Sequence, residues 1–156
     1  MKKLLPFLLF AVLLLSACNE VEVPESFTLT LKTGGGYSHV SLILYTITAG
    51  DGDTVPWHYE YKMIDGTGNS YDSEMSIEEA KALYIVLIEN DFETLENVSA
   101  DFITDLTTET VTLKSEELNH SFRAYGSGLL PDKRHSNIIR AIFDSCPVPE
   151  EFTPFN

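Results

Sequence analysis

The sequence has little cysteine and lacks the short motifs that usually mark a catalytic or metal site. Only Cys18 and Cys146 occur among its 156 residues. There is no Cys-x-x-Cys, His-x-His or HExxH spacing, and no GxSxG nucleophile elbow. Four histidines lie far apart in the chain: His39, His58, His120 and His135. We therefore predict no metal, no cofactor and no enzymatic activity.

Positive charge is also scarce. The chain has 10 Lys and Arg residues against 24 Asp and Glu residues, a net charge of −14 with histidine neutral. Nucleic-acid binding draws its affinity from neutralising phosphates with Lys and Arg, so this composition excludes a nucleic-acid partner. It also argues against a domain that lies flat on anionic lipid. The acidic surface provides solubility, or it attracts cations or a basic partner.

Long apolar runs are absent except at the N-terminus. Residues 4–15 are apolar apart from an interruption at Pro6, and they follow the basic pair Lys2 and Lys3. A helix of this length spans ~18 Å, well short of the ~30 Å hydrocarbon core of a bilayer. A basic start, a short apolar run and small residues after it are typical of a signal peptide, so we predict that residues 1–17 are cleaved.

The apolar run ends in Leu15-Ser16-Ala17-Cys18, which resembles the lipobox of bacterial lipoproteins. The resemblance covers only this N-terminal segment. It implies that Cys18 becomes the first residue of the mature chain and carries a diacylglycerol, with acyl chains such as palmitate in the membrane. Each buried CH₂ contributes ~0.8 kcal/mol, so two or more chains anchor a protein stably. An ordinary secretory signal followed by a chance cysteine is the alternative.

The residue after the cysteine bears on location. In lipoproteins of Gram-negative cells, an aspartate there tends to retain the protein in the inner membrane. Asn19 stands in that place here. The resemblance therefore implies a cell-envelope protein held by lipid in the outer membrane, on its periplasmic or surface face.

The remaining chain has the length of one domain. Cleavage before Cys18 leaves 139 residues, and removal of the two leader lysines leaves 8 basic against 24 acidic residues, a net charge near −16. Lipid on Cys18 would leave Cys146 without a disulfide partner in the chain, so the fold would depend on its core. The predicted divisions are a lipoprotein signal peptide (residues 1–17), a lipidated N-terminus and tether (18–26), a single α+β domain (27–146) and a C-terminal tail (147–156).

Hydrophobic periodicity predicts an α+β fold. Alternation of apolar and polar residues predicts strands at residues 27–32, 55–64, 108–114 and 119–125, and a run rich in β-branched and aromatic residues predicts another at residues 38–48. Ser76 and Glu79 form a capping box that predicts a helix over residues 77–90, and an apolar stripe predicts a second helix over residues 131–145. The order β-β-β-α-β-β-α favours an antiparallel sheet of about five strands with two helices on one face. This layout loosely resembles that of small uncharacterised envelope lipoproteins with a glycine-rich first turn.

The register of the first hairpin follows from its turn. A two-residue turn at Asp51 and Gly52 is expected between the strands at residues 38–48 and 55–64. It would make one face apolar and aromatic and the other mixed, which supports the register. The predicted pairs on the apolar face are Val40 with Met63, Leu42 with Tyr61, Leu44 with Tyr59 and Thr46 with Trp57.

Two groups of residues are candidate binding surfaces. Trp57, Tyr59 and Tyr61 share one strand face; they either pack beneath the helices or form an aromatic platform for a protein or glycan in the envelope. Cations concentrate in the last third of the chain, either as local charge balance or as a patch for an acidic ligand: Arg123, Lys133, Arg134 and Arg140.

These observations predict a membrane-anchored envelope lipoprotein that acts as a non-enzymatic binding or accessory module. One alternative is a small envelope hydrolase that pairs His58 or His120 with a carboxylate. The other is a partner-binding or inhibitor module. It would act through the aromatic strand, or through the apolar arc of the helix at residues 77–90, which is broader than a surface helix needs.

Overall fold

One sheet and two helices make up the described part of the chain. The computed structural model describes residues 21–35, 39–99 and 106–154. The strands are β1 (Phe27–Gly35), β2 (Val40–Ala49), β3 (Thr54–Met63), β4 (Gly68–Ser76), β5 (Val98–Ser99), β6 (Thr107–Ser115) and β7 (Asn119–Tyr125). The helices are α2 (Ile77–Glu89) and α3 (Arg134–Ser145), with short 3₁₀ turns at Phe92–Thr94, Ser127–Leu129 and Glu150–Phe152.

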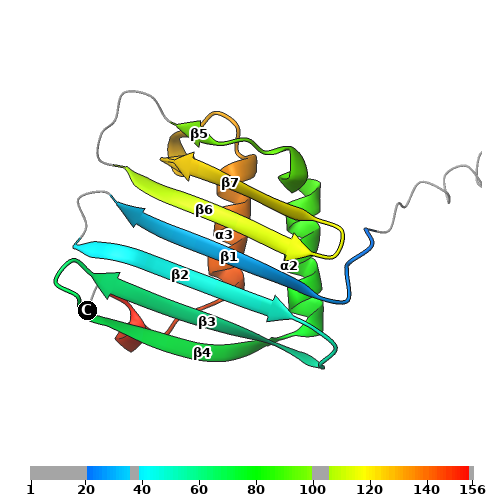
Figure 1. The fold of residues 1–156 in the computed structure, drawn as a ribbon, viewed down its shortest axis with the longest axis horizontal. Helices are drawn as coiled ribbons and strands as arrows, with labels where there is room; N and C mark the ends of the chain where they lie inside the picture. The colour runs from blue at the N-terminus through cyan, green and yellow to red at the C-terminus, as the bar shows by residue number, and fades with distance from the viewer. Residues whose placement is uncertain (1–20, 36–38, 100–105, 155–156) are drawn as a thin grey trace, which may run out of the picture.

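The strands form a single sheet in the order β4-β3-β2-β1-β6-β7-β5. Neighbouring strands are antiparallel except for β5, which runs parallel to β7. Both helices lie on the same side of the sheet, and the other side is open (Figure 1). The predicted α+β class is confirmed. The predicted count of about five antiparallel strands is wrong, because the sheet is mixed and has seven strands.

The largest difference is β4, which sequence periodicity did not reveal. The sequence of residues 65–70, with Gly66 and Gly68, predicts a single turn there and no strand before the helix. The turn is shorter, with Gly66 at a φ of 87°, and β4 pairs with β3 along its whole length, from Lys62 opposite Gly68 to Thr54 opposite Ser76. β4 lies at the edge of the sheet and is mostly exposed, so little apolar alternation is needed to form it.

The predicted register of the β2–β3 hairpin is wrong by one residue over most of its length. Trp57 lies opposite Ile47 and Tyr59 opposite Tyr45. The connection comprises residues 50–53, four residues instead of a two-residue turn. A bulge after Val40 restores the predicted pairing of that residue with Met63. As a result, the two sides of β2 are exchanged relative to the prediction. Ile43, Tyr45 and Ile47 point to the helices, and Leu42, Leu44 and Thr46 point outward.

The core fills the space between the sheet and the two helices. The predicted capping box starts α2: the Ser76 hydroxyl accepts from the Glu79 backbone N–H at 3.2 Å, and Glu79 Oε2 accepts from the Ser76 backbone N–H at 2.8 Å. The predicted apolar stripe of α3 is mostly buried: His135, Ile138, Ile139, Ile142 and Cys146 are buried, whereas Phe143 is 39% exposed. The largest fully buried side chains come from both layers: Leu29, Leu31, Ile47, Val55, Leu83, Leu87, Phe92, Leu95, Leu113, Phe122, Ile138 and Ile142.

The two ends of the chain differ in what the structure describes. Residues 1–20, which include the predicted leader and Cys18, lie outside the described residues. No helix within the described ranges is long and apolar enough to span a membrane. Near the C-terminus, the Phe152 ring packs on Tyr71 of β4 with centroids 5.0 Å apart. The segment after α3 is therefore a strap against the edge strand.

The burial of Trp57 generates a stability prediction. Trp57→Ala should lower the free energy of unfolding by about 3–5 kcal/mol, because it removes a buried indole and leaves a cavity. Lys62→Ala, on the outward side of the same strand, should change it by less than about 0.5 kcal/mol. Urea unfolding monitored by circular dichroism measures both. Equal effects of the two substitutions would contradict the burial of this side of β3.

Candidate functional site

The aromatic residues singled out from the sequence lie mainly inside the protein. Trp57 is 4% exposed and Tyr59 is 2% exposed, whereas Tyr61 is half-buried. The Tyr59 ring packs on Tyr45 at 5.0 Å, and Tyr45 meets Phe143 of α3 edge-on at 5.5 Å. Burial disfavours the phenolate and raises the pKa of Tyr59 to about 12. Of the two interpretations of this strand face, packing beneath the helices is the one the structure shows.

The apolar arc of α2 is used in the same way. Its buried residues are Ala80, Leu83, Tyr84 and Leu87. Val86, beyond this arc, is half-buried and lines a groove of about 460 Å³ between α2 and α3. Most of the broad arc is therefore explained by contact with the sheet and with α3.

The cations of the last third of the chain do not form one patch. Arg123 points outward from β7, whereas Lys133, Arg134 and Arg140 lie at α3 on the other side of the sheet. Arg134 bonds the carboxylate of Asp132 at 2.6 Å, and these hydrogen bonds lower the pKa of Asp132 to about 2. Local charge balance thus accounts for Arg134, and of these four cations only Arg123 lies on the open side of the sheet.

Two histidines have structural roles. His120 Nε2 donates to the Leu95 carbonyl at 2.8 Å, and His135 Nε2 donates to the Glu96 carbonyl at 3.1 Å. Both rings also pack edge-on against phenylalanines. His120 thereby holds the segment after α2 against β7, and His135 holds it against α3. In the described part of the chain, no three His, Cys, Asp or Glu side chains are arranged to bind a metal ion. Cys146 is a core residue: its free thiol is buried, and burial raises its pKa to about 12.

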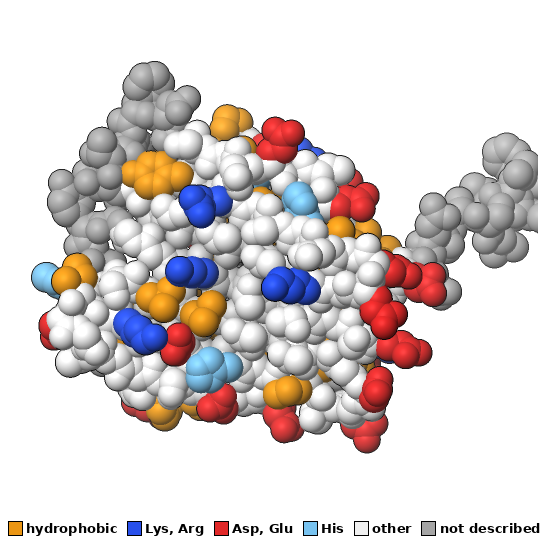
Figure 2. All heavy atoms as spheres, in the orientation of Figure 1, with side chains coloured by type: hydrophobic (Ala, Val, Ile, Leu, Met, Phe, Trp, Pro, Cys, Tyr) orange, Lys and Arg blue, Asp and Glu red, His pale blue; other side chains and the backbone are white. Residues whose placement is uncertain are grey.

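The side of the sheet opposite the helices is an open surface (Figure 2). We call it the outer face. Its side chains are the outward-pointing residues of β4, β3, β2, β1, β6 and β7. Hydroxyl groups dominate it: Thr28, Thr30, Thr46, Thr48, Ser70, Thr108, Thr110, Thr112 and Ser121. Basic side chains are spread across its centre, while acidic side chains gather along one edge of the view in Figure 2. The basic residues are Lys32, Lys62, Lys114 and Arg123.

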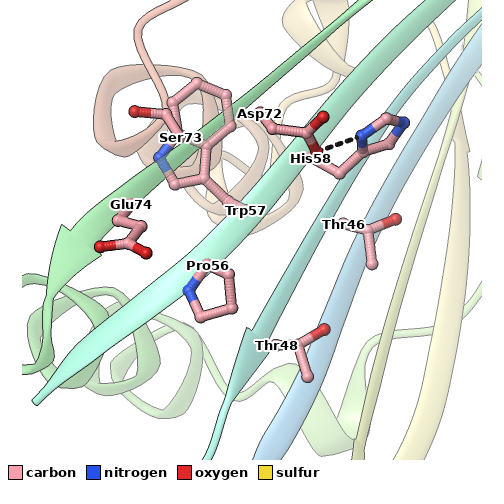
Figure 3. Close-up of a pocket in the computed structure, with 8 residues that line it drawn as sticks. All are labelled: Thr46, Thr48, Pro56, Trp57, His58, Asp72, Ser73 and Glu74. Atoms are coloured by element: carbon pink, nitrogen blue, oxygen red, sulfur yellow. Dashed lines mark hydrogen bonds and ion pairs between the residues drawn. The ribbon is translucent and has the colours of Figure 1, made fainter. Parts of the chain in front are cut away.

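A hollow of about 330 Å³ lies on the outer face where β2, β3 and β4 run side by side (Figure 3). His58 and Asp72, paired across β3 and β4, meet in it: His58 Nδ1 donates to Asp72 Oδ1 at 2.7 Å. Thr46 is the cross-strand neighbour of His58 on β2. The hollow is lined by Thr46, Thr48, Pro56, Trp57, His58, Asp72, Ser73 and Glu74.

The His58–Asp72 pair offers a base held by a carboxylate. Asp72 fixes the orientation of the imidazole and directs Nε2 away from the pair (Figure 3). Within the described contacts, however, no hydrogen bond joins Thr46 to His58. The His58 side chain is 38% exposed and the Asp72 side chain 80% exposed. Water therefore screens the ion pair, and little desolvation is available to strengthen it. The geometry suits recognition by hydrogen bonds better than nucleophilic chemistry.

The structure also reveals a buried carboxyl that sequence reasoning missed. Glu109 of β6 is 9% exposed. Its Oε1 accepts from the Thr107 hydroxyl at 2.8 Å, and among the described residues no group lies within hydrogen-bond distance and geometry of its Oε2. Burial raises the pKa of this carboxyl, although hydrogen bonds from Thr107 and Ser127 oppose the shift. The signal was present in the sequence: Glu109 is in phase with Val111 and Leu113 on the apolar side of the strand.

The fold and site together define an α+β protein with one covered and one open sheet face. Neither a scan of protein-family models nor a search of curated proteins finds a match to this chain. Function is therefore inferred from the residues and geometry of this chain alone.

Glu109 generates a pH prediction. Because its pKa is higher in the folded than in the unfolded state, its contribution to stability is full below the ordinary pKa of 4.5 and is lost as pH rises through the folded value. The amide side chain that Glu109→Gln introduces does not titrate. The melting temperature of the variant minus that of the unsubstituted protein should therefore rise between about pH 4 and pH 7. Calorimetry at a series of pH values measures this. The exposed Glu116→Gln is the matched control, and identical pH profiles for both variants would contradict the assignment.

Proposed function

We propose that this protein is a lipid-anchored, non-enzymatic binding module of the bacterial cell envelope. The lipobox-like segment supports anchoring through lipid on Cys18, and Asn19 supports the outer membrane. The binding role rests on one observation: the sheet buries one side beneath α2 and α3 and leaves an outer face rich in hydroxyl and basic groups exposed.

The distribution of charge supports a domain that stands off the membrane. β1 begins at Phe27, so residues 18–26 would hold the domain within ~30 Å of the anchor at ~3.3–3.6 Å per residue. Carboxylates surround the entry of the tether into the domain and line a hollow there: Glu22, Glu25, Asp51, Glu116 and Glu117. Anionic lipid would repel this acidic end, which keeps the outer face accessible to a ligand.

The anchor has a direct test. Protein extracted from membranes with detergent should have a mass that corresponds to a chain starting at Cys18 plus its acyl groups. Cys18→Ser should lose this added mass, because the hydroxyl replaces the thiol that carries the lipid. Cys146→Ser is the matched control and should keep it. An unchanged mass and unchanged membrane association in Cys18→Ser would refute lipidation.

A hydrolase is the second candidate function, favoured by the 2.7 Å bond between His58 and Asp72 in the hollow. We expect the protein to turn over none of a panel of esters, peptides and glycans. The exposed His39 provides a control for any activity that is found. Turnover that His58→Gln abolishes and His39→Gln leaves intact would establish the hydrolase and overturn the binding role.

A further inference from the structure

We propose that the outer face binds an extended anionic polysaccharide through its four central strands, β2, β1, β6 and β7. This inference deepens the binding role proposed above and rests on it. We call the outward positions of these strands the basic half. They are Thr28, Thr30, Lys32, Leu42, Leu44, Thr46, Thr48, Thr108, Thr110, Thr112, Lys114, Asn119, Ser121, Arg123 and Tyr125.

The basic half is free of carboxylates in a strongly acidic protein. The chain has 24 Asp and Glu residues, yet none occupies an outward position of these four strands. Carboxylates return at its borders: Glu60, Asp72 and Glu74 on the neighbouring strands β3 and β4, and Glu116 in the β6–β7 turn, which lines a hollow with Lys114. Among the described strand residues, Lys32 and Arg123 thus present positive charge with no carboxylate at an outward position of the same four strands, and Lys114 adds a third cation near their end. This charge attracts an anionic ligand and repels a cationic one.

The spacing of the cations indicates a long ligand. Lys32 lies opposite Thr110, and Thr110 lies opposite Arg123, so the two cations share one row across three strands. Two strand spacings separate them, ~10 Å, and Lys114 lies four residues from Thr110 along β6, ~14 Å. One small anion cannot contact all three side chains. A polymer with repeated negative groups can.

A row of hydroxyl groups crosses the strands between the row of Lys32 and Arg123 and the position of Lys114. Thr46, Thr30, Thr112 and Ser121 face one another across β2, β1, β6 and β7. The hydroxyls of Thr112 and Ser121 are 3.0 Å apart, and Ser121 Oγ donates to the Val111 carbonyl at 3.0 Å. Hydroxyl groups both donate and accept hydrogen bonds, as sugar hydroxyls do. A fixed row of them between cations suits an acidic glycan.

Other anionic partners fit this surface less well. The core of a stable protein interface is apolar, whereas most outward side chains here carry hydroxyl or basic groups and the apolar ones, Leu42, Leu44 and Tyr125, are already half-buried. A membrane surface is disfavoured by the acidic end around the tether. A second copy of the chain could place the acidic end around its tether against the basic half. Measurement of self-association distinguishes this partner from a polysaccharide.

The experiment measures binding of the full-length protein in non-ionic detergent to immobilised dextran sulfate and polygalacturonate, with neutral dextran as the reference polymer. We expect binding to both anionic polymers and none to dextran, with affinity that falls as salt is added, because exposed charges are screened. Lys32→Gln/Arg123→Gln should weaken binding about tenfold, which corresponds to about 1.4 kcal/mol.

The matched control is Lys81→Gln/Arg140→Gln, which removes the same charge from exposed positions on the helical side. It should bind within about twofold of the unsubstituted protein. Equal weakening in both variants, or no binding to either anionic polymer, would overturn the proposal while leaving the lipid anchor untouched. Binding to phosphatidylglycerol vesicles alone would also overturn the proposal, because it would assign the outer face to a membrane. Self-association that only Lys32→Gln/Arg123→Gln abolishes would overturn it too, because it would assign this face to a second copy of the chain.

Discussion

The burial of one face of the sheet beneath α2 and α3 is the constraint on which the rest of the structure depends. Side chains alternate along every strand, so the choice of the inward set also decides the outward set. Leu29 and Leu31 turn inward from β1, and Thr28, Thr30 and Lys32 turn outward as a consequence. Packing of the core therefore determines which strand positions lie on the open face, and hydroxyl and basic side chains occupy many of them.

Sequence periodicity was sufficient where a strand or helix has one clearly apolar side. It located β1, β6, β7, the start of α2 at its capping box and the stripe of α3. It failed at β4, which needs little apolar surface because it lies at the edge of the sheet. It also failed in the β2–β3 hairpin, where Leu42 and Leu44 are as apolar as Ile43 and Ile47, so apolarity alone did not define the side. The length of the connecting loop decided the register, and the local sequence Asp51-Gly52 suggested a shorter turn than the one formed.

The candidate site could be predicted only in part for the same reason. The sequence showed the aromatic residues of β3 and left open whether they were covered; the helices cover Trp57 and Tyr59. The pairing of His58 with Asp72 depends on β4, and the basic half depends on bringing residues 32, 114 and 123 onto one surface. Such contacts between distant segments follow from the strand order, which the spacing of residues in the sequence does not contain.

One face of the sheet serves folding, and we propose that the other serves binding. Mapping the ligand footprint by nuclear magnetic resonance tests it most directly: amide signals of the isotope-labelled protein are recorded while dextran sulfate is added. The account predicts that shifts concentrate on β1, β6 and β7 around Lys32, Thr112 and Arg123, and that α2 and α3 are unaffected. Shifts centred on the helices, or spread evenly over the surface, would contradict it.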